Sequence, residues 1–207
     1  MSQLERQFQI LADHWHRGFG REVKRSAIAF CLLVLIFFGA CVVSPALRDL
    51  LATQILPLFD GLDVSGEDGT LSAMALFANN LRACSITMVY GLLPYVQLPA
   101  LAMGANAMVI GFLAAYCITA GSSPLVFLLG ILPHGLFELP ALVLAFAMGL
   151  YVCGQITRRC RHDETAVPLW DCVTLMSWLL LLVLIPLLAV AAAIEAYVTP
   201  LLLSLVM

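Results

Sequence analysis

Two long stretches of this chain are almost free of formal charge. Between residues 71 and 154 the only charged side chains are Arg82 and Glu138. From residue 173 to residue 207 the only one is Glu195. Stretches of this length and polarity lie in lipid, or in protein that is itself surrounded by lipid. Only 11% of the 207 residues are charged and 62% are hydrophobic, which leaves too little polar surface for a water-soluble globule. The sequence therefore predicts an all-α integral membrane protein.

Basic side chains cluster in two of the segments that separate the apolar runs. Residues 1–26 interleave Lys and Arg with large apolar side chains, which predicts a basic amphipathic cytoplasmic segment. A second cluster lies within residues 155–171, whereas residues 49–70 are acidic and contain no Lys or Arg. Because the cytoplasmic segments of membrane proteins are enriched in Lys and Arg, both basic segments are predicted to be cytoplasmic.

The apolar runs predict about five transmembrane helices, with the N-terminus in the cytoplasm and the C-terminus outside. Residues 27–207 are expected to form a single helical transmembrane domain, in which the turns "MGAN" from Met103 and "AGSSP" from Ala120 separate the middle three helices. The segment Pro45–Leu58 is short and flanked by proline, so it is expected to lie along the outer interface. The expected helices are Ala27–Val43, Leu81–Ala102, Gly104–Thr119, Pro124–Cys153 and Val173–Val206.

Prolines are expected to break or kink the last two of these helices. The fourth contains Pro133 followed by Gly135, and the fifth contains Pro186 and Pro200. A proline inside a helix removes one hydrogen bond and clashes with the preceding turn. We therefore expect the fourth helix to be interrupted within two residues of 133–135. The similar stretches "LLPYVQLPAL" and "ILPHGLFELPAL" are compatible with an internal repeat, or with chance in a chain rich in Leu, Pro and Ala.

Among the polar side chains within the predicted helices or at their ends, six stand out as candidates for a shared site. His134 and Glu138 are four residues apart, so they share one face of a continuous helix. Small residues at 141, 145 and 149 continue along that face and allow other helices to approach closely. The pair is therefore expected to point into the bundle. The predicted topology brings four further side chains to the same outer half of the bundle: Asn79, Asn80, Arg82 and Glu195.

This predicted cluster permits more than one chemistry. A carboxylate within a membrane costs several kcal/mol unless it is paired, protonated or bound to a cation. Arg82 is the one basic residue expected to reach Glu138 and Glu195, which leaves a surplus negative charge. The cluster is then either a structural hydrogen-bond network or a binding site for a cation or a proton. His134, Glu138 and Glu195 are also acceptable ligands for a divalent metal such as zinc.

Four motifs resemble the stage II sporulation protein M family. They are "NNLRA" at 79–83, "MGANAMVIGFL" at 103–113, "LPHGLFELPA" at 132–141 and "AAAIEAYVTP" at 191–200, in this order along the chain. The resemblance implies a multispanning protein of a bacterial or archaeal plasma membrane. In spore formers, the member resembled here holds peptidoglycan-degrading enzymes at the engulfing septum. The signature residues that the resemblance carries over are Asn80, His134, Gly135, Glu138, Pro140, Glu195 and Pro200.

Three functions follow from these observations. The resemblance favours a non-enzymatic membrane scaffold linked to remodelling of the cell envelope and peptidoglycan, with protein partners in the envelope and room for a homo-oligomer. The proline-containing helices and intramembrane carboxylates are also typical of a transporter or a protein that binds a small solute or ion. An intramembrane metal-dependent hydrolase stays open, although no known protease motif is present. A net charge of −3 and the lack of a basic domain argue against nucleic-acid binding.

Overall fold

The computed structural model describes residue 12 and residues 14–60, 72–121 and 123–204. Within these ranges the chain forms helices and turns and no strand. Four helical stretches are long and apolar enough to cross a membrane: Gly20–Val43, Leu98–Thr119, Gly135–Cys160 and Leu169–Leu202. The prediction of an all-α membrane protein is confirmed. Most of the predicted N-terminal amphipathic segment, and the acidic side chains at 63, 67 and 68, lie outside the described residues.

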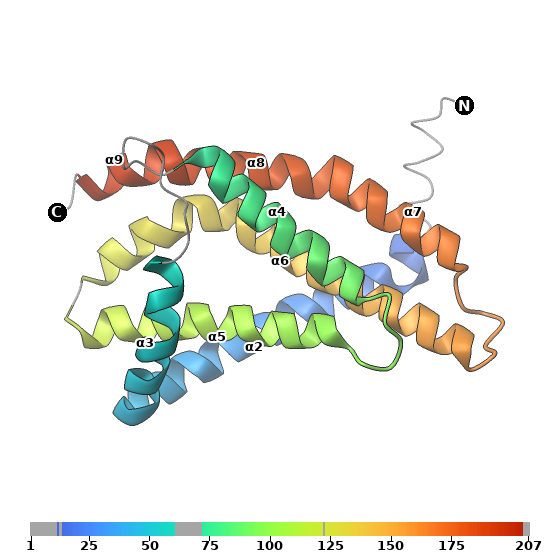
Figure 1. Ribbon diagram of the computed structural model, residues 1–207, viewed down its shortest axis with the longest axis horizontal. Helices are drawn as coiled ribbons and strands as arrows, with labels where there is room; N and C mark the ends of the chain where they lie inside the picture. Colours follow the sequence, from blue (N-terminus) through green and yellow to red (C-terminus); the bar gives the residue numbers. More distant parts are fainter. Residues whose placement is uncertain (1–11, 13, 61–71, 122, 205–207) are drawn as a thin grey trace.

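The longest helix, α6 (Pro124–Cys160), is the centre of the bundle. It packs against α2 (Gly20–Val43), α4 (Ala73–Tyr90), α5 (Leu98–Thr119) and α8 (Ile185–Ala193). Helices α5 and α8 lie on opposite sides of it (Figure 1). At 1.5 Å per residue α6 is about 55 Å long, well beyond the ~30 Å hydrocarbon core of a bilayer. Part of α6 must therefore project past the lipid.

The predicted interruption at Pro133 is wrong, because α6 is helical throughout. Pro133 and Pro140 both lie inside it. The helix bends in its N-terminal half instead of breaking (Figure 1). Proline is a common cause of such kinks, and a helix packed on several sides can keep the rest of its hydrogen bonds.

The second and third predicted crossings are divided at the wrong place. The turn between α4 and α5 comprises residues 91–97, and α5 runs without a break through "MGAN". Gly91, Pro94 and Pro99 cluster around this turn, whereas the Asn106 amide donates to the Ala102 carbonyl at 2.8 Å and so stays within the helix. The stretch "LLPYVQLPAL" is therefore mostly turn and "ILPHGLFELPAL" is entirely helix, so the two similar stretches do not form a structural repeat.

The last part of the chain is a nearly continuous helical rod with two widened turns. It comprises α7 (Leu169–Leu179), the π-turn η2 (Leu180–Leu184), α8, the π-turn η3 (Ile194–Val198) and α9 (Thr199–Ser204). Each π-turn directly precedes a helix whose second residue is proline, at Pro186 and Pro200. A widened turn accommodates a residue that cannot donate its N–H to the ladder. The sequence predicts a break or kink near these prolines, and the structure shows a widened turn before each of them and no break.

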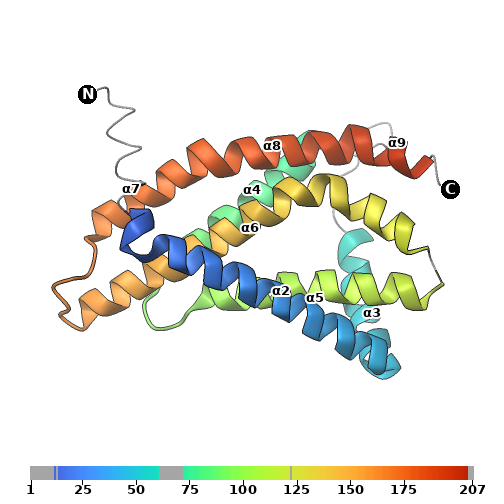
Figure 2. The same ribbon diagram turned by 180° about the vertical axis from the view of Figure 1, so that it is seen from behind.

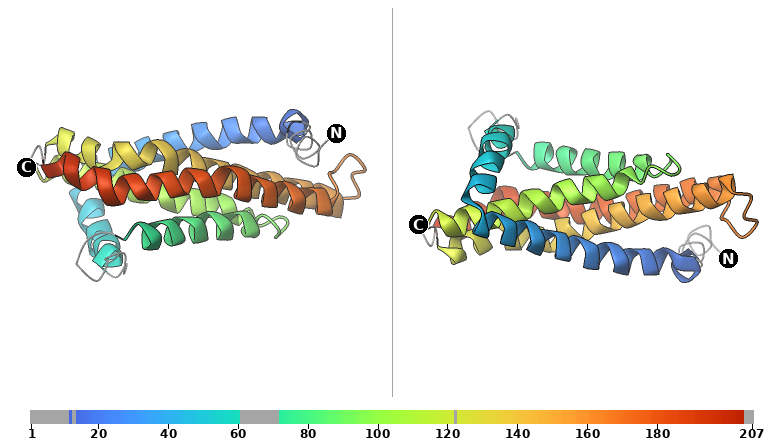
Figure 3. Two further views of the ribbon diagram at one scale, coloured as in Figure 1. Left: turned by 90° about the horizontal axis from the view of Figure 1, so that it is seen from above. Right: turned by 90° about the horizontal axis from the view of Figure 1, so that it is seen from below.

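Helix α3 (Pro45–Asp60) lies across the other helices (Figure 3). Ser44 precedes Pro45 and is extended, with φ −113° and ψ 98°, so α2 ends at Val43. The Ser44 hydroxyl oxygen then accepts a hydrogen bond from the Leu47 N–H at 3.3 Å at the start of α3. Buried Ile55 ties α3 to α2 and α5 through a small cluster with Cys41 and Phe112.

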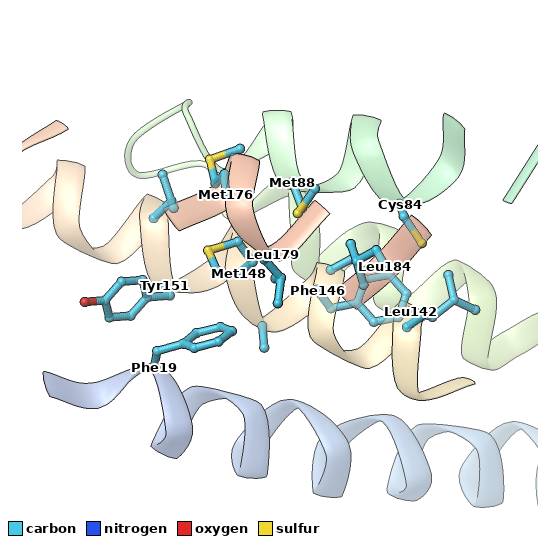
Figure 4. Packing of buried hydrophobic residues seen from close by; sticks show 14 of the residues in the cluster. Phe19, Cys84, Met88, Leu142, Phe146, Met148, Tyr151, Met176, Leu179 and Leu184 are labelled. Atoms are coloured by element: carbon cyan, nitrogen blue, oxygen red, sulfur yellow. The ribbon is translucent and has the colours of Figure 1, made fainter. Parts of the chain in front are cut away.

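The turns of the bundle gather at its two ends. The start of α2, the turn 91–97 and the loop 161–168 lie at one end, and α3, the end of α5, the start of α6 and α9 lie at the other (Figures 1 and 2). Between the ends, large side chains of α2, α4, α6 and the C-terminal rod form the main core (Figure 4). The Phe30 and Phe146 rings, for example, pack α2 against α6 with their centroids 5.8 Å apart.

Candidate functional site

Three half-buried polar side chains meet where α4, α6 and the C-terminal rod pack together. The Asn80 side chain on α4 lies near the Glu138 carboxyl group on α6. Glu195, in η3, is close enough to Glu138 to act on it as a like charge. The segments themselves are in contact, since α6 packs against both α4 and η3. Three of the six predicted site residues are therefore neighbours, and we refer to Glu138 and Glu195 as the acid pair.

The backbone around each member of the acid pair departs from a regular α-helix. Glu138 lies between the two internal prolines of α6, in the half of the helix that bends. Glu195 is the second residue of η3, where Thr199 donates to the Ile194 carbonyl with its N–H and, at 3.4 Å, with its hydroxyl. A π-turn shifts the side chains before it relative to those after it, and such turns are frequent at functional sites. These distortions set the directions of both carboxylates.

Arg82 and Asn79 do not belong with the acid pair. Both are exposed, and no carboxylate of the described residues lies within 4 Å of the Arg82 guanidinium group. On a helix of 3.6 residues per turn, Arg82 projects about 200° away from Asn80. Only one of these two side chains can therefore face α6, and the structure places Asn80 there.

Cys84 is a neighbour of Glu138 that the sequence analysis missed. It lies one turn after Asn80 on α4, is fully buried, and is close enough to Glu138 for an electrostatic interaction. Cys84 belongs to the same core cluster as Leu142 and Leu184 (Figure 4). The i, i+4 spacing from Asn80 is the signal that would have identified it.

The acid pair has no basic partner in the described structure. The described ion pairs all lie elsewhere, in α2, at the start of α3, and between the last turn of α6 and the loop 161–168. Two carboxylates close together in an apolar bundle favour sharing a proton or binding a cation. The arrangement is chemically able to do either.

The metal set proposed from sequence stays a prediction. Position 134 is part of the continuous helix α6, but the His134 side chain lies outside what the structure describes. Among the side chains that are described, no three His, Cys, Asp or Glu residues are grouped so that they could hold a metal ion. A divalent cation at Glu138 and Glu195 would thus depend on His134 or on ligands outside these side chains.

The small residues along α6 do bring other helices close. Ala141 and Ala145 are fully buried, and Gly149 is buried too. A Cβ atom added at Gly149 would lie 2.7 Å from the Pro99 Cγ and 2.8 Å from the Thr87 carbonyl oxygen. The predicted role of this face in helix packing is confirmed. Of the predicted motif residues, Gly135 is also buried, Pro133 is half-buried, and Pro140 and Pro200 are exposed.

The fold and the composition together define a multi-pass helical membrane protein. The family model described as "Stage II sporulation protein M" matches residues 27–200, which is most of the chain. The chain therefore belongs to the stage II sporulation protein M family. This match begins within α2, ends within α9 and includes the acid pair. No curated protein and no solved structure gives a significant match.

Proposed function

We propose that this chain is a non-enzymatic scaffold of the cell envelope that recruits partner proteins within the membrane. Family membership supports this role, and so does the architecture. The connections described between α4, α5, α6 and α7 are short, so the described chain offers partners mainly helix surfaces and bundle ends. Many large apolar side chains are exposed on these helices, among them Leu35 on α2 and Leu101 on α5. Such surfaces suit contact with lipid and with other membrane proteins.

The proposed orientation places the end with the turn 91–97 in the cytoplasm. Six basic residues lie at that end: Arg21, Lys24, Arg25, Arg158, Arg159 and Arg161. This agrees with the positive-inside rule. With α4 counted as a crossing, the chain makes five passes, beginning inside and finishing outside, in a bacterial or archaeal plasma membrane. Residues 27–207 then form one transmembrane domain that follows the basic segment 1–26.

The scaffold proposal is tested by isolating the tagged protein from cross-linked membranes of its own host. We expect peptidoglycan-degrading activity, measured in a gel that contains peptidoglycan, to co-purify with it. A tagged membrane protein of similar size and number of passes, expressed at the same level, serves as the control. Equal activity in both preparations would count against the proposal. Because a scaffold does not need the acid pair to be charged, Glu138→Gln should retain the associated activity.

The acid pair supports a second candidate, a membrane protein that binds a cation or a proton. The observation that favours it is the proximity of Glu138 and Glu195 with no basic partner among the described side chains. Metal analysis of the protein, purified without chelator and then dialysed, addresses this directly. A stoichiometric cation that is lost in Glu195→Gln supports binding, whereas equal cation content in the two proteins argues against it.

A further inference from the structure

A second polar region, separate from the acid pair, lies at the end of the bundle that contains the turn 91–97. A cavity of about 620 Å³ opens between the start of α2, the turn 91–97 and the last turns of α6. Four arginines line it, namely Arg21, Arg25, Arg158 and Arg161, against a single acidic residue, Glu22. We call this cavity the arginine pocket. Figure 2 shows how the three segments that form it converge.

Two of the four arginines are matched by carboxylates and two are not. Arg25 lies 3.7 Å from Glu22, and Arg158 lies 2.8 Å from Asp163. No carboxylate of the described chain lies within 4 Å of Arg21 or Arg161. Like charges gathered around one cavity repel each other unless an anion enters. The positive charge of the pocket is therefore only partly compensated by the described carboxylates, and an anion in the pocket would be stabilised.

Arg161 is held in place by an aromatic ring. Its guanidinium carbon lies 5.7 Å from the centre of the Tyr95 ring, in a cation–π contact. This contact leaves the edges of the guanidinium group, with their N–H donors, available to an anion. Arg161 is thus positioned without being neutralised.

The turn that carries Tyr95 is strained and is fixed to α6. Tyr95 and Gln97, which both line the pocket, have positive φ angles of 68° and 49°. The Tyr95 N–H donates to the Thr157 Oγ1 at 3.0 Å, and the Cys153 thiol contacts the Leu93 carbonyl at 3.3 Å. The Thr157 hydroxyl accepts this bond and keeps its own proton to donate. Strained backbone of this kind persists where the surroundings fix it, and it is common around ligand sites.

We propose that the arginine pocket binds the phosphate group of an anionic ligand. Guanidinium groups bind phosphate through two parallel N–H···O bonds, and Gln97 and Thr157 add neutral donors. Because α2 and α6 are apolar helices that end here, the pocket lies at the level expected for phospholipid headgroups. A lipid headgroup and a soluble phosphate compound share this chemistry. The proposal does not depend on the scaffold role or on a cation at the acid pair.

The test compares two double variants of the full-length protein that remove equal charge. Arg21→Gln with Arg161→Gln removes the two unmatched arginines of the pocket, and Arg48→Gln with Arg82→Gln removes two arginines outside it. Each protein is reconstituted in nanodiscs of phosphatidylcholine with or without phosphatidylglycerol, and native mass spectrometry measures the lipids that stay bound after extraction. We expect the pocket variant to retain phosphatidylglycerol about tenfold less strongly than wild type, the effect of losing one good charged contact, and the other variant to match wild type.

A second arm separates the two sources of phosphate. Binding of inorganic phosphate to lipid-stripped wild-type protein, measured by calorimetry and lost in the pocket variant, indicates a soluble ligand. Retention of phosphatidylglycerol without phosphate binding indicates a headgroup site. If both double variants lose binding equally, or neither does, the pocket is not a site. Should the glutamine variant fold poorly, Arg21→Lys with Arg161→Lys keeps the charge but removes the fork geometry, and undiminished binding there would contradict the proposal.

Discussion

The acid pair and the arginine pocket differ in how deeply their charged groups are buried and in how many such groups they contain. Glu138 and Glu195 are half-buried within the bundle, where each charge is costly and two are enough to define a site. The pocket brings four arginines together at the end of the bundle. There a charged side chain has a low desolvation cost, and a single arginine contributes little binding energy. Inside the membrane, a few charged groups are therefore enough to indicate a site, because each of them is buried. At the surface, a site is indicated only where several charged groups lie together. Both depend on α6, which carries Glu138 in one half and Arg158 in the other, directly before Arg161.

The largest expected effect comes from breaking the helix packing between the two regions. Gly149 lies on α6 between Glu138 and Arg158, and a Cβ there would meet Pro99 and the backbone of Thr87 at less than 3 Å. Gly149→Ala should lower the free energy of unfolding by about 1–3 kcal/mol, the usual cost of overpacking. Both regions should then weaken together. Thermal unfolding in detergent measures the loss.

Gly154→Ala is the matched control for this variant. It lies on the same helix, yet an added Cβ would have no atom within 4 Å. Alanine is also the better helix former, so this change should be neutral or stabilising. Equal unfolding temperatures for the two variants would show that the close approach at Gly149 does not hold the regions together.

The next largest effect should come from neutralising the acid pair. Glu195→Gln keeps the shape of the side chain and removes its repulsion with Glu138. In protein stripped of cations we expect this variant to be more stable than wild type by about 1 kcal/mol, the order of one polar contact within a membrane. Added cation should raise the unfolding temperature of wild type but not of the variant.

Glu164→Gln controls for the loss of one negative charge, because Glu164 is exposed in the loop 161–168. It should respond to cations as wild type does. If Glu195→Gln destabilises the cation-free protein, the acid pair is a hydrogen-bonded structural element. That result would contradict the hypothesis that the acid pair binds a cation.

The same contrast explains which features the sequence could predict. Inside the membrane a polar residue is conspicuous, so Asn80, Glu138 and Glu195 could be identified one by one. The partner of the acid pair was harder to predict, because Arg82 and Asn80 are two residues apart and the rotation of α4 decides which of them faces α6. Likewise, proline spacing located the irregular turns near Pro186 and Pro200, but whether Pro133 breaks or bends α6 depends on packing around it.

The arginine pocket could not be predicted in this way. Basic residues are expected at the cytoplasmic end of any membrane protein, so the pattern indicated orientation and nothing more. Arg21 and Arg161 are distant in sequence, and their convergence depends on where the turn 91–97 lies. The sequence pattern instead predicts a turn at "MGAN", about ten residues further along the chain. The site therefore required the three-dimensional arrangement of α2, α5 and α6.

A smaller effect is expected from loosening the turn that borders the pocket. Thr157→Val keeps the side-chain volume but removes the acceptor for the Tyr95 N–H. We expect a loss of about 0.5–1 kcal/mol, the net worth of one hydrogen bond, and faster amide hydrogen exchange in residues 91–97. Ser177→Ala removes an exposed hydroxyl that bonds the Val173 carbonyl within α7 and should leave that turn unchanged. Similar exchange in the two variants would mean that Thr157 does not fix the turn.

The smallest effect should come from Asp163, which draws one pocket arginine towards the loop 161–168. Hydrogen bonds from the Thr165 side chain and from Arg158, at 2.6 Å and 2.8 Å, lower the pKa of Asp163 from its ordinary 3.8 to about 2. A carboxyl group whose pKa is lowered by folding stabilises the fold fully above its unfolded pKa, and that contribution disappears as the pH falls through the folded value. Asp163→Asn should therefore lower the unfolding temperature slightly and by a constant amount above pH 5, and the difference from wild type should close between about pH 4 and pH 2.

Because the variant also releases Arg158, retention of phosphatidylglycerol should be equal to wild type or stronger. Weaker retention would mean that Asp163 orients Arg158 for the anion, and the pocket would then resemble the acid pair in needing a positioned partner.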